Sequence, residues 1–278
     1  MFIEREDIIS MKNALLYKKN IILQGPPGTG KTFFAKRLAY LIMNTKDPHS
    51  VEMVQFHQSY AYEDFIQGYR PTEDGKFKKK NGVFYNFCKK AESNPLNKFF
   101  FIIDEINRGN LSKIFGELML LIEADKRGTE HAISLTYSDE NQLKFSIPEN
   151  IYIIGTMNTA DRSLAMVDYA LRRRFSFIDI EPSFSKQFKS HLLSLGVSRS
   201  FVSKIISKFQ SLNKIINEDK NLGSGFEIGH SYFCTFKKEM NEKEWYSSII
   251  QHEIYPLLNE YWFDNDSKAK EEQNKLDL

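Results

Sequence analysis

Cysteine is scarce in this chain of 278 residues, which holds only Cys88 and Cys234. The two lie far apart in the sequence and neither belongs to a C-x-x-C pair, so the sequence indicates neither a disulfide framework nor a zinc site. We expect both residues to be ordinary thiols of the core or the surface.

Long apolar runs are also missing. No stretch approaches the ~20 apolar residues that a membrane-spanning helix needs. The first residues, Met-Phe-Ile-Glu-Arg-Glu-Asp, are charged where a signal peptide would be apolar. These two absences predict a cytoplasmic protein with no membrane partner.

The chain has no excess of charge of either sign. Lys+Arg 38 against Asp+Glu 36 gives a net charge of +2, and this does not create the basic field that marks nucleic-acid binders. The one concentrated basic feature is the run Lys76-Phe-Lys-Lys-Lys80, which lies between the turn signals Asp74-Gly75 and Asn81-Gly82. These signals predict a β-hairpin over residues 72–85. A solvated hairpin face is the favoured interpretation, and contact with a nucleic acid or a partner stays open.

A glycine-rich turn follows the first strongly apolar run. The segment Ile21–Thr32 reads Ile-Ile-Leu-Gln-Gly-Pro-Pro-Gly-Thr-Gly-Lys-Thr and contains the pattern G-x-x-x-x-G-K-[ST] between a predicted strand and a predicted helix. Glycines at such positions allow positive φ angles, so that backbone N–H groups curl around a di- or triphosphate. The predicted phosphate-binding residues are Gly25, Pro26, Pro27, Gly28, Thr29, Gly30, Lys31 and Thr32.

Two side chains of this loop have chemical roles in the prediction. Lys31 can reach the terminal phosphates at the positive end of the helix that begins there, and the Thr32 hydroxyl is suited to ligate Mg²⁺.

A second apolar run ends in two acids. Residues Phe99–Ile103 read Phe-Phe-Phe-Ile-Ile and predict a buried strand, and Asp104 and Glu105 follow it. We predict that Asp104 holds Mg²⁺ and that Glu105 orients or deprotonates the water that attacks the γ-phosphate. Leu111–Ala124 then shows the apolar spacing of a helix.

Two further groups complete the candidate site. Ile151–Gly155 predicts another strand, and Asn158 beyond its end can sense the γ-phosphate, since neighbouring parallel strands end at one edge of a sheet. Arg172, Arg173 and Arg174 are consecutive at the end of a short predicted helix. A salt-bridged surface explains one or two of them, whereas three also suit an arginine finger for a neighbouring subunit's site.

The chain changes character after Glu181-Pro182-Ser183. Three predicted helices follow, at 188–195, 201–217 and 245–261. The predicted domains are an α/β nucleotide-binding domain over residues 1–181 and a helical lid over 182–263. Residues 264–278 are predicted to be a frayed or disordered polar tail. The glycine-flanked turn at 223–233 either reaches back to the nucleotide or is a loop between helices.

The order of these motifs resembles that of AAA+ ATPases. The segments Gly25-Pro-Pro-Gly-Thr-Gly-Lys-Thr32, Asp104-Glu-Ile-Asn-Arg-Gly-Asn110 and Met157-Asn-Thr-Ala-Asp-Arg-Ser163 closely resemble the McrB family, the GTP-hydrolysing motor subunits of modification-dependent restriction systems. The resemblance covers about residues 5–262. It implies an α/β P-loop NTPase fold: a three-layer αβα sandwich with a central parallel sheet, and a small C-terminal helical lid.

The resemblance also implies partners and residue roles. Asn158 and Asp161 would help to place the hydrolytic water, Arg173 and Arg174 would act at a subunit interface, and Arg108 would face a neighbour. The protein would form a ring, expected to be a hexamer, be stimulated by a McrC-like nuclease subunit, and meet DNA indirectly through that complex.

Several questions stay open at this point. No N-K-x-D guanine motif is present, so GTP rather than ATP rests on the resemblance alone. McrB proteins often carry an N-terminal domain that reads modified DNA, and here the phosphate-loop strand begins about twenty residues from Met1. We therefore expect either an excised motor domain or target recognition by a partner. The alternatives are an ATP-driven remodelling ATPase and a nucleotide-gated assembly scaffold.

Overall fold

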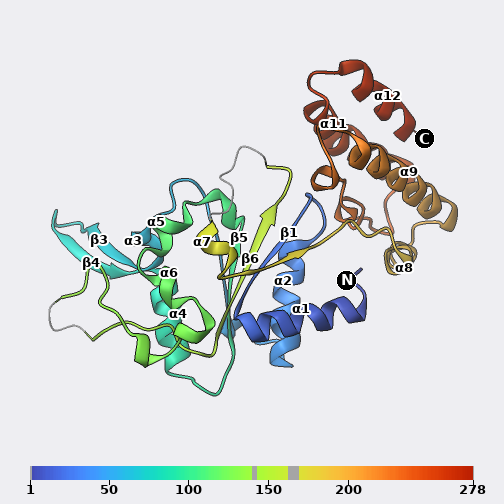
Figure 1. The fold of residues 1–278 in the computed structure, drawn as a ribbon. Coiled ribbons are helices and arrows are strands. Elements are labelled where there is room, and N and C mark those ends of the chain that lie inside the picture. The colour runs from blue at the N-terminus through green and yellow to red at the C-terminus, as the bar shows by residue number, and fades with distance from the viewer. Residues whose placement is uncertain (1, 140–142, 162–168, 278) are drawn as a thin grey trace.

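A computed structural model describes residues 2–139, 143–161 and 169–277. Figure 1 shows two parts, an α/β domain formed by the first two thirds of the chain and a helical domain formed by the last third. The N-terminus lies on the side of the α/β domain that faces the helical domain.

The α/β domain is built on a five-stranded parallel sheet with the strand order β2-β5-β6-β1-β7. The three apolar runs that predicted strands before the phosphate loop, before Asp104 and before Asn158 lie in this sheet. The strands are β1 (Asn20–Gly25), β2 (Val51–Gln55), β5 (Phe99–Asp104), β6 (Ile151–Asn158) and β7 (Ser176–Asp179).

Side chains alternate between the two faces of the sheet, and each face is covered by helices. Ile21 and Leu23 pack against α1 (Arg5–Lys18) and α2 (Lys31–Met43), whereas Ile22 packs into the core on the opposite face. That opposite core includes α3 (Tyr62–Phe65), α4 (Val83–Glu92), α5 (Leu111–Phe115) and α6 (Leu118–Leu121). A short helix, α7 (Tyr169–Arg172), precedes β7. The domain is therefore the three-layer αβα sandwich that the sequence predicted.

The predicted hairpin is present, but its limits differ. Strands β3 (Gln67–Pro71) and β4 (Phe77–Asn81) pair antiparallel and project from the end of the α/β domain far from the helical domain (Figure 1). Residues 83–85, which were predicted to belong to the hairpin, instead begin α4. Phe84, Phe87 and Cys88 are buried at helical spacing, so packing of this face determines a helix there.

The predicted helix over 111–124 is interrupted. Gly116 adopts φ +51°, and this separates α5 from α6. The break lets Glu117 accept a hydrogen bond of 2.6 Å from the Tyr62 hydroxyl. Further along the chain, Ile133 and Phe145 form an isolated antiparallel bridge.

The helical domain contains the predicted helices and packs around its own apolar core. Its helices are α8 (Lys186–Leu195), α9 (Arg199–Glu218), α10 (Glu242–Ile249), α11 (Tyr255–Tyr261) and α12 (Asp266–Leu276). A π-helical segment, Ile250–Ile254, joins α10 to α11, where Pro256 has no N–H for a regular turn. None of the helices described here is both long and apolar enough to span a bilayer.

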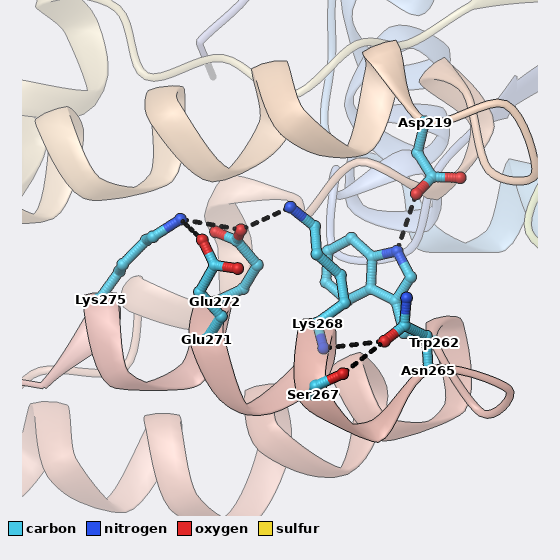
Figure 2. Close-up of polar contacts among 8 residues, drawn as sticks. All are labelled: Asp219, Trp262, Asn265, Ser267, Lys268, Glu271, Glu272 and Lys275. Atoms are coloured by element: carbon cyan, nitrogen blue, oxygen red, sulfur yellow. Dashed lines mark hydrogen bonds and ion pairs between the residues drawn. The ribbon is translucent and has the colours of Figure 1, made fainter.

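The prediction of a disordered tail is wrong, because most of it forms α12. Ala269 and Leu276 are 1% exposed and join the core of the helical domain. Glu272, also 1% exposed, lies 2.8 Å from Lys268 Nζ and 2.9 Å from Lys275 Nζ. Figure 2 shows its carboxylate between these two lysines. Composition suggested disorder because the charged residues outnumber the apolar ones, but a few apolar positions on one face are enough to dock the helix.

Replacing Leu276 by Ala tests this docking. We expect the free energy of unfolding to fall by about 2–4 kcal/mol, since a buried leucine is removed from the core. Urea unfolding followed by circular dichroism measures this change, with Lys270→Ala on the exposed side of α12 as the matched control. Equal stability of the two variants would show that the segment does not contribute to the core.

Candidate nucleotide-binding site

The loop between β1 and α2 has the backbone that the sequence predicted. Gly25, Gly28 and Gly30 have φ angles of +154°, +76° and +77°. A Cβ atom on Gly25 would lie 2.3 Å from the Ile180 carbonyl oxygen, so a larger residue there would collide with the backbone next to β7. The loop leads directly into α2, whose amino end carries partial positive charge.

Lys31 lies inside the curve of this loop. Its ammonium group donates hydrogen bonds of 2.9 and 2.8 Å to the carbonyl oxygens of Gly25 and Pro26, and the residue is only 7% exposed. Burial lowers the pKa of Lys31 to about 8, while the carboxylates of Asp104 and Glu105 oppose this shift. The loop therefore holds a buried cation where a phosphate-binding site needs one.

Asp104 connects three segments at the carboxyl edge of the sheet. Its Oδ1 atom accepts hydrogen bonds from Thr32 Oγ1 at 2.6 Å and from Thr156 Oγ1 at 2.5 Å. Thr156 Oγ1 also accepts from the backbone N–H of Glu105 at 3.2 Å. Thr156 is not among the predicted site residues. Its position near the end of β6, beside the end of β5, was the available signal.

Glu105 is turned by its backbone and held by two neighbours. It adopts φ +51°, which is unusual for a residue other than glycine. Its Oε2 atom lies 2.5 Å from Arg108 Nε and accepts a hydrogen bond from Gln55 Nε2 at 3.2 Å. Arg108 in turn lies 3.1 Å from Asp161 Oδ2. Gln55 was missed by the sequence analysis, although it ends β2 and pairs in register with Asp104.

Asn158 ends β6 opposite the first glycine of the loop. Asn158 pairs in register with Gly25, and the backbone N–H of Thr159 donates to the Gly25 carbonyl at 3.1 Å. Asn158, Asp161, Arg108 and Pro27 line one pocket of 770 Å³, together with residues of the helical domain. Those residues are Asn221, Leu222, Phe226, Leu257, Glu260, Tyr261, Phe263 and Asp264, and Ala160 completes the lining.

The turn at 223–233 contacts the phosphate loop directly. Gly229 and Ser231 donate backbone hydrogen bonds to the carbonyl oxygens of Pro27 and Gly28, at 3.1 and 2.8 Å. The Thr159 hydroxyl donates to the Gly225 carbonyl at 3.0 Å. Of the two interpretations that the sequence left open, the structure supports a turn that reaches back to the site.

Arg173 and Arg174 do not join the site of their own chain. Arg174 Nη2 and Arg173 Nη2 lie 3.0 and 2.9 Å from Glu123 Oε1. The Arg174 carbonyl accepts from Asn20 Nδ2 at 3.0 Å, at the amino end of β1. Because Gly25 is five residues further along that strand, the two ends are about 16 Å apart. The structure thus separates the arginines from the phosphate loop.

The buried residue Arg127 contacts Asn20 at the amino end of β1, opposite the phosphate loop. Arg127 is 5% exposed and donates to the Asn20 side chain at 2.8 Å and to the Ile122 carbonyl at 2.9 Å. Burial lowers the pKa of Arg127 to about 10. Arg127 was not predicted from the sequence, since a lone arginine outside any motif gives no sign of burial.

The oxygen atoms of Thr32 and Asp104 fit a magnesium ion. Among the described residues, no group of three or more His, Cys, Asp and Glu side chains is placed to hold a metal. Mg²⁺ in nucleotide sites needs only one or two protein oxygens, because phosphates and waters supply the other ligands. The adjacent Thr32 hydroxyl and Asp104 carboxylate meet that requirement.

Comparison with known families agrees with this geometry. Residues 20–175 match the AAA domain of the dynein-related subfamily, and residues 204–270 match the alpha-helical lid domain of McrB. The chain is 55% identical to the type IV methyl-directed restriction enzyme EcoKMcrB subunit of Escherichia coli K12, over 99% of this chain and 61% of that protein. It is also 29% identical to the type II restriction enzyme BsuMI component YdiS of Bacillus subtilis 168, over 75% of this chain and 72% of that protein.

The chain spans 61% of the length of the Escherichia coli protein, so the similarity covers only part of that relative. The match to the AAA domain contains the phosphate loop, Asp104, Glu105 and Asn158. The match to the McrB lid domain contains the turn at 223–233 that contacts the loop. The chain belongs to the dynein-related subfamily of AAA domains, which are P-loop nucleoside triphosphatases, and it carries the helical lid of McrB proteins.

Proposed function

We propose that this chain is a Mg²⁺-dependent nucleoside triphosphatase, with GTP as the preferred substrate, that acts as the motor subunit of an McrBC-like restriction system for modified DNA. One observation carries the catalytic part of the proposal. The phosphate loop, the Asp104 carboxylate with its two threonine donors, and Glu105 all meet at the same edge of one parallel sheet. The preference for GTP and the role in restriction rest on similarity to McrB.

The proposed mechanism is in-line attack of water on the γ-phosphate. Backbone N–H groups of the loop and the Lys31 ammonium bind the phosphates and stabilise the charge that develops on them. Thr32 and Asp104 would hold Mg²⁺, which supplies further neutralisation of the β- and γ-phosphates. The side-chain contacts of Glu105 with Arg108 and Gln55 both use its Oε2 atom. The Oε1 atom is therefore left to accept a proton from the attacking water. Asn158, on the neighbouring strand, would orient that water.

We propose that the site is completed by a second copy of the chain in a ring, expected to be hexameric. Arg173 and Arg174 lie at the far edge of the sheet, so they are unsuited to their own site but available to a neighbouring one. The Arg173 side chain is 68% exposed and that of Arg174 is 11% exposed, so Arg173 is the better candidate for an arginine finger. Arg174 is the better candidate for holding Glu123 and the loop around it.

A McrC-like nuclease subunit is the proposed partner, and its effect on turnover separates this function from the alternatives. Stimulated GTP hydrolysis supports a restriction motor. A preference for ATP supports a remodelling ATPase, and binding without stimulated turnover supports an assembly scaffold. Comparing kcat/KM for GTP and ATP, with and without the partner, distinguishes the three.

Replacing Glu105 by Gln tests the catalytic assignment. We expect kcat to fall at least about a hundredfold, since the general base is lost, while nucleotide affinity changes little. Steady-state hydrolysis and binding of a fluorescent nucleotide measure the two quantities. Lys113→Gln, an exposed substitution on α5, serves as the control. A Glu105→Gln variant with normal turnover would remove Glu105 from the mechanism.

The pKa of Lys31 predicts how nucleotide affinity depends on pH. Phosphates bind the ammonium form, so the pKa of Lys31 is higher in the complex than its value of about 8 in the free protein. Affinity should therefore be constant at lower pH and fall as the pH rises through that value. Between about pH 7 and about pH 9 we expect Kd to rise about tenfold. In Lys31→Met, Kd should be higher throughout and lose this dependence. A constant Kd for the unaltered protein would contradict the assignment.

Mixing two inactive variants tests whether Arg173 acts on a neighbour. Arg173→Ala alone should lower kcat about a thousandfold if it removes an arginine finger. A mixture with Glu105→Gln should be more active than either variant alone, because some interfaces then combine an intact Glu105 with an intact Arg173. Hydrolysis rates across a titration of the two variants measure this recovery. An arginine that acted within its own chain, or only in folding, would give no recovery.

A further inference from the structure

The first two helices of the helical domain are strongly basic. Residues 182–217 contain six Lys and Arg residues and no Asp or Glu, in a chain with a net charge of only +2. The near-neutral total therefore conceals a local excess of positive charge, which the sequence analysis overlooked because these residues are spread over two helices. The six are Lys186, Lys189, Arg199, Lys204, Lys208 and Lys214.

Part of this charge borders a groove between α8 and α9. The α8–α9 groove has a volume of 540 Å³, its lining contains no carboxylate, and it presents lysine ammonium groups, serine hydroxyls and one glutamine amide. Its lining residues are Phe184, Ser185, Lys186, Lys189, Ser203, Ile206, Ser207, Gln210, Ser211 and Lys214. Such a set of hydrogen-bond donors without acids is suited to an anion.

Local geometry adds to the positive potential of the groove. The ten-residue helix α8 begins there, and its N-cap residue Ser185 makes no side-chain capping bond. Within the described part of the chain, Ser185 Oγ has no hydrogen-bond partner. The amino end of α8 therefore directs the positive end of its dipole, together with Lys186 and Lys189, toward the groove. Lys214, at the other end, lies 3.9 Å from Glu218, and both side chains are more than 65% exposed, so this pair neutralises little of its charge.

The length of the groove indicates the kind of anion. Ser203, Ser207 and Ser211 recur every four residues and so lie on one face of α9, and Lys214 extends this row. From Ser203 to Lys214 the helix rises about 16 Å. A single phosphate is much smaller than this, whereas several successive phosphates of one DNA strand occupy a length of this order. Lysine, serine and glutamine side chains contact phosphates without reading the bases.

We propose that the α8–α9 groove binds the sugar–phosphate backbone of duplex DNA. This goes beyond the proposed function, which assigns no DNA contact to any residue of this chain. The contact is independent of base sequence, so it would keep the protein bound to DNA of any sequence, while target recognition resides elsewhere.

The hairpin that the sequence singled out is a weaker candidate for the same role. Its Lys79 lies 2.5 Å from Asp139, Arg70 pairs with Asp64, and Lys76 lies 3.8 Å from Asp74. Neighbouring carboxylates thus offset most of the hairpin charge, whereas none lines the α8–α9 groove.

A triple substitution in the full chain tests the proposal. Lys186→Gln, Lys189→Gln and Lys214→Gln together remove the ammonium groups of the groove and leave the nucleotide site untouched. The control is Lys46→Gln, Lys98→Gln and Lys237→Gln, which removes the same charge from exposed positions elsewhere. A third variant, Lys78→Gln with Lys80→Gln, tests the hairpin. The probe is a fluorescein-labelled duplex of about 30 base pairs, followed by anisotropy at several salt concentrations.

We expect the groove variant to bind the duplex at least about tenfold more weakly near 0.1 M salt, and the slope of log K against log salt to become shallower by about 2 to 3. The control and hairpin variants should stay within about twofold of the unaltered protein, while all variants keep the same melting temperature. Inorganic phosphate at equal ionic strength should not compete with the duplex better than chloride does.

Several outcomes would overturn the proposal. They are no duplex binding by the unaltered chain at low salt, equal loss in the groove and control variants, loss confined to the hairpin variant, and selective competition by inorganic phosphate. Nucleotide hydrolysis without DNA, measured on the same samples, reports separately on the proposed catalytic function. Failure of one proposal is thus distinguishable from failure of the other.

Discussion

The site depends on one carboxylate oxygen. Asp104 Oδ1 accepts hydrogen bonds from the first turn of α2 and from β6, while Asp104 itself ends β5. Three segments that are distant in the sequence are therefore held within hydrogen-bonding reach of one atom. This arrangement is possible because parallel strands end at a common edge, where turns release polar side chains from an apolar core.

The helical domain is tied to this edge by main-chain groups. Gly229 and Gly28 approach so closely that a Cβ atom on Gly229 would lie 2.0 Å from the Gly28 carbonyl carbon. The hydrogen bonds from Gly229 and Ser231 to the phosphate loop need this close approach. A change in the conformation of the loop must therefore either carry the helical domain with it or break those bonds.

The sequence predicted the features that depend on apolar runs and on fixed motif spacing. Strands β1, β5 and β6 of the parallel sheet, the loop glycines and the main lid helices are where apolar pattern and turn chemistry placed them. Errors arose where tertiary contacts override local signals. Gly116 ends a helix that the apolar pattern continued, and α12 is ordered by a few buried residues in a charged segment.

Polar residues whose role depends on contacts with distant parts of the same chain were the hardest to recognise from the sequence. Thr156, Gln55 and Arg127 each contact a side chain at least 50 positions away, so spacing within a local segment does not reveal these contacts. Arg162 and Ser163, which end the Met157–Ser163 motif, lie outside the described residues. Charge asymmetry within the lid was visible in the sequence, but counting the whole chain averaged it away.

Strand β1 has a different partner at each end. Its carboxyl end becomes the loop that surrounds Lys31, and its amino end, through Asn20, is bonded to the carbonyl of Arg174 and to the guanidinium of Arg127. Extended backbone in the middle of a sheet is stiff along its axis. In the proposed ring of subunits, β1 would therefore transmit a displacement at one nucleotide to the arginines that we propose act on the next.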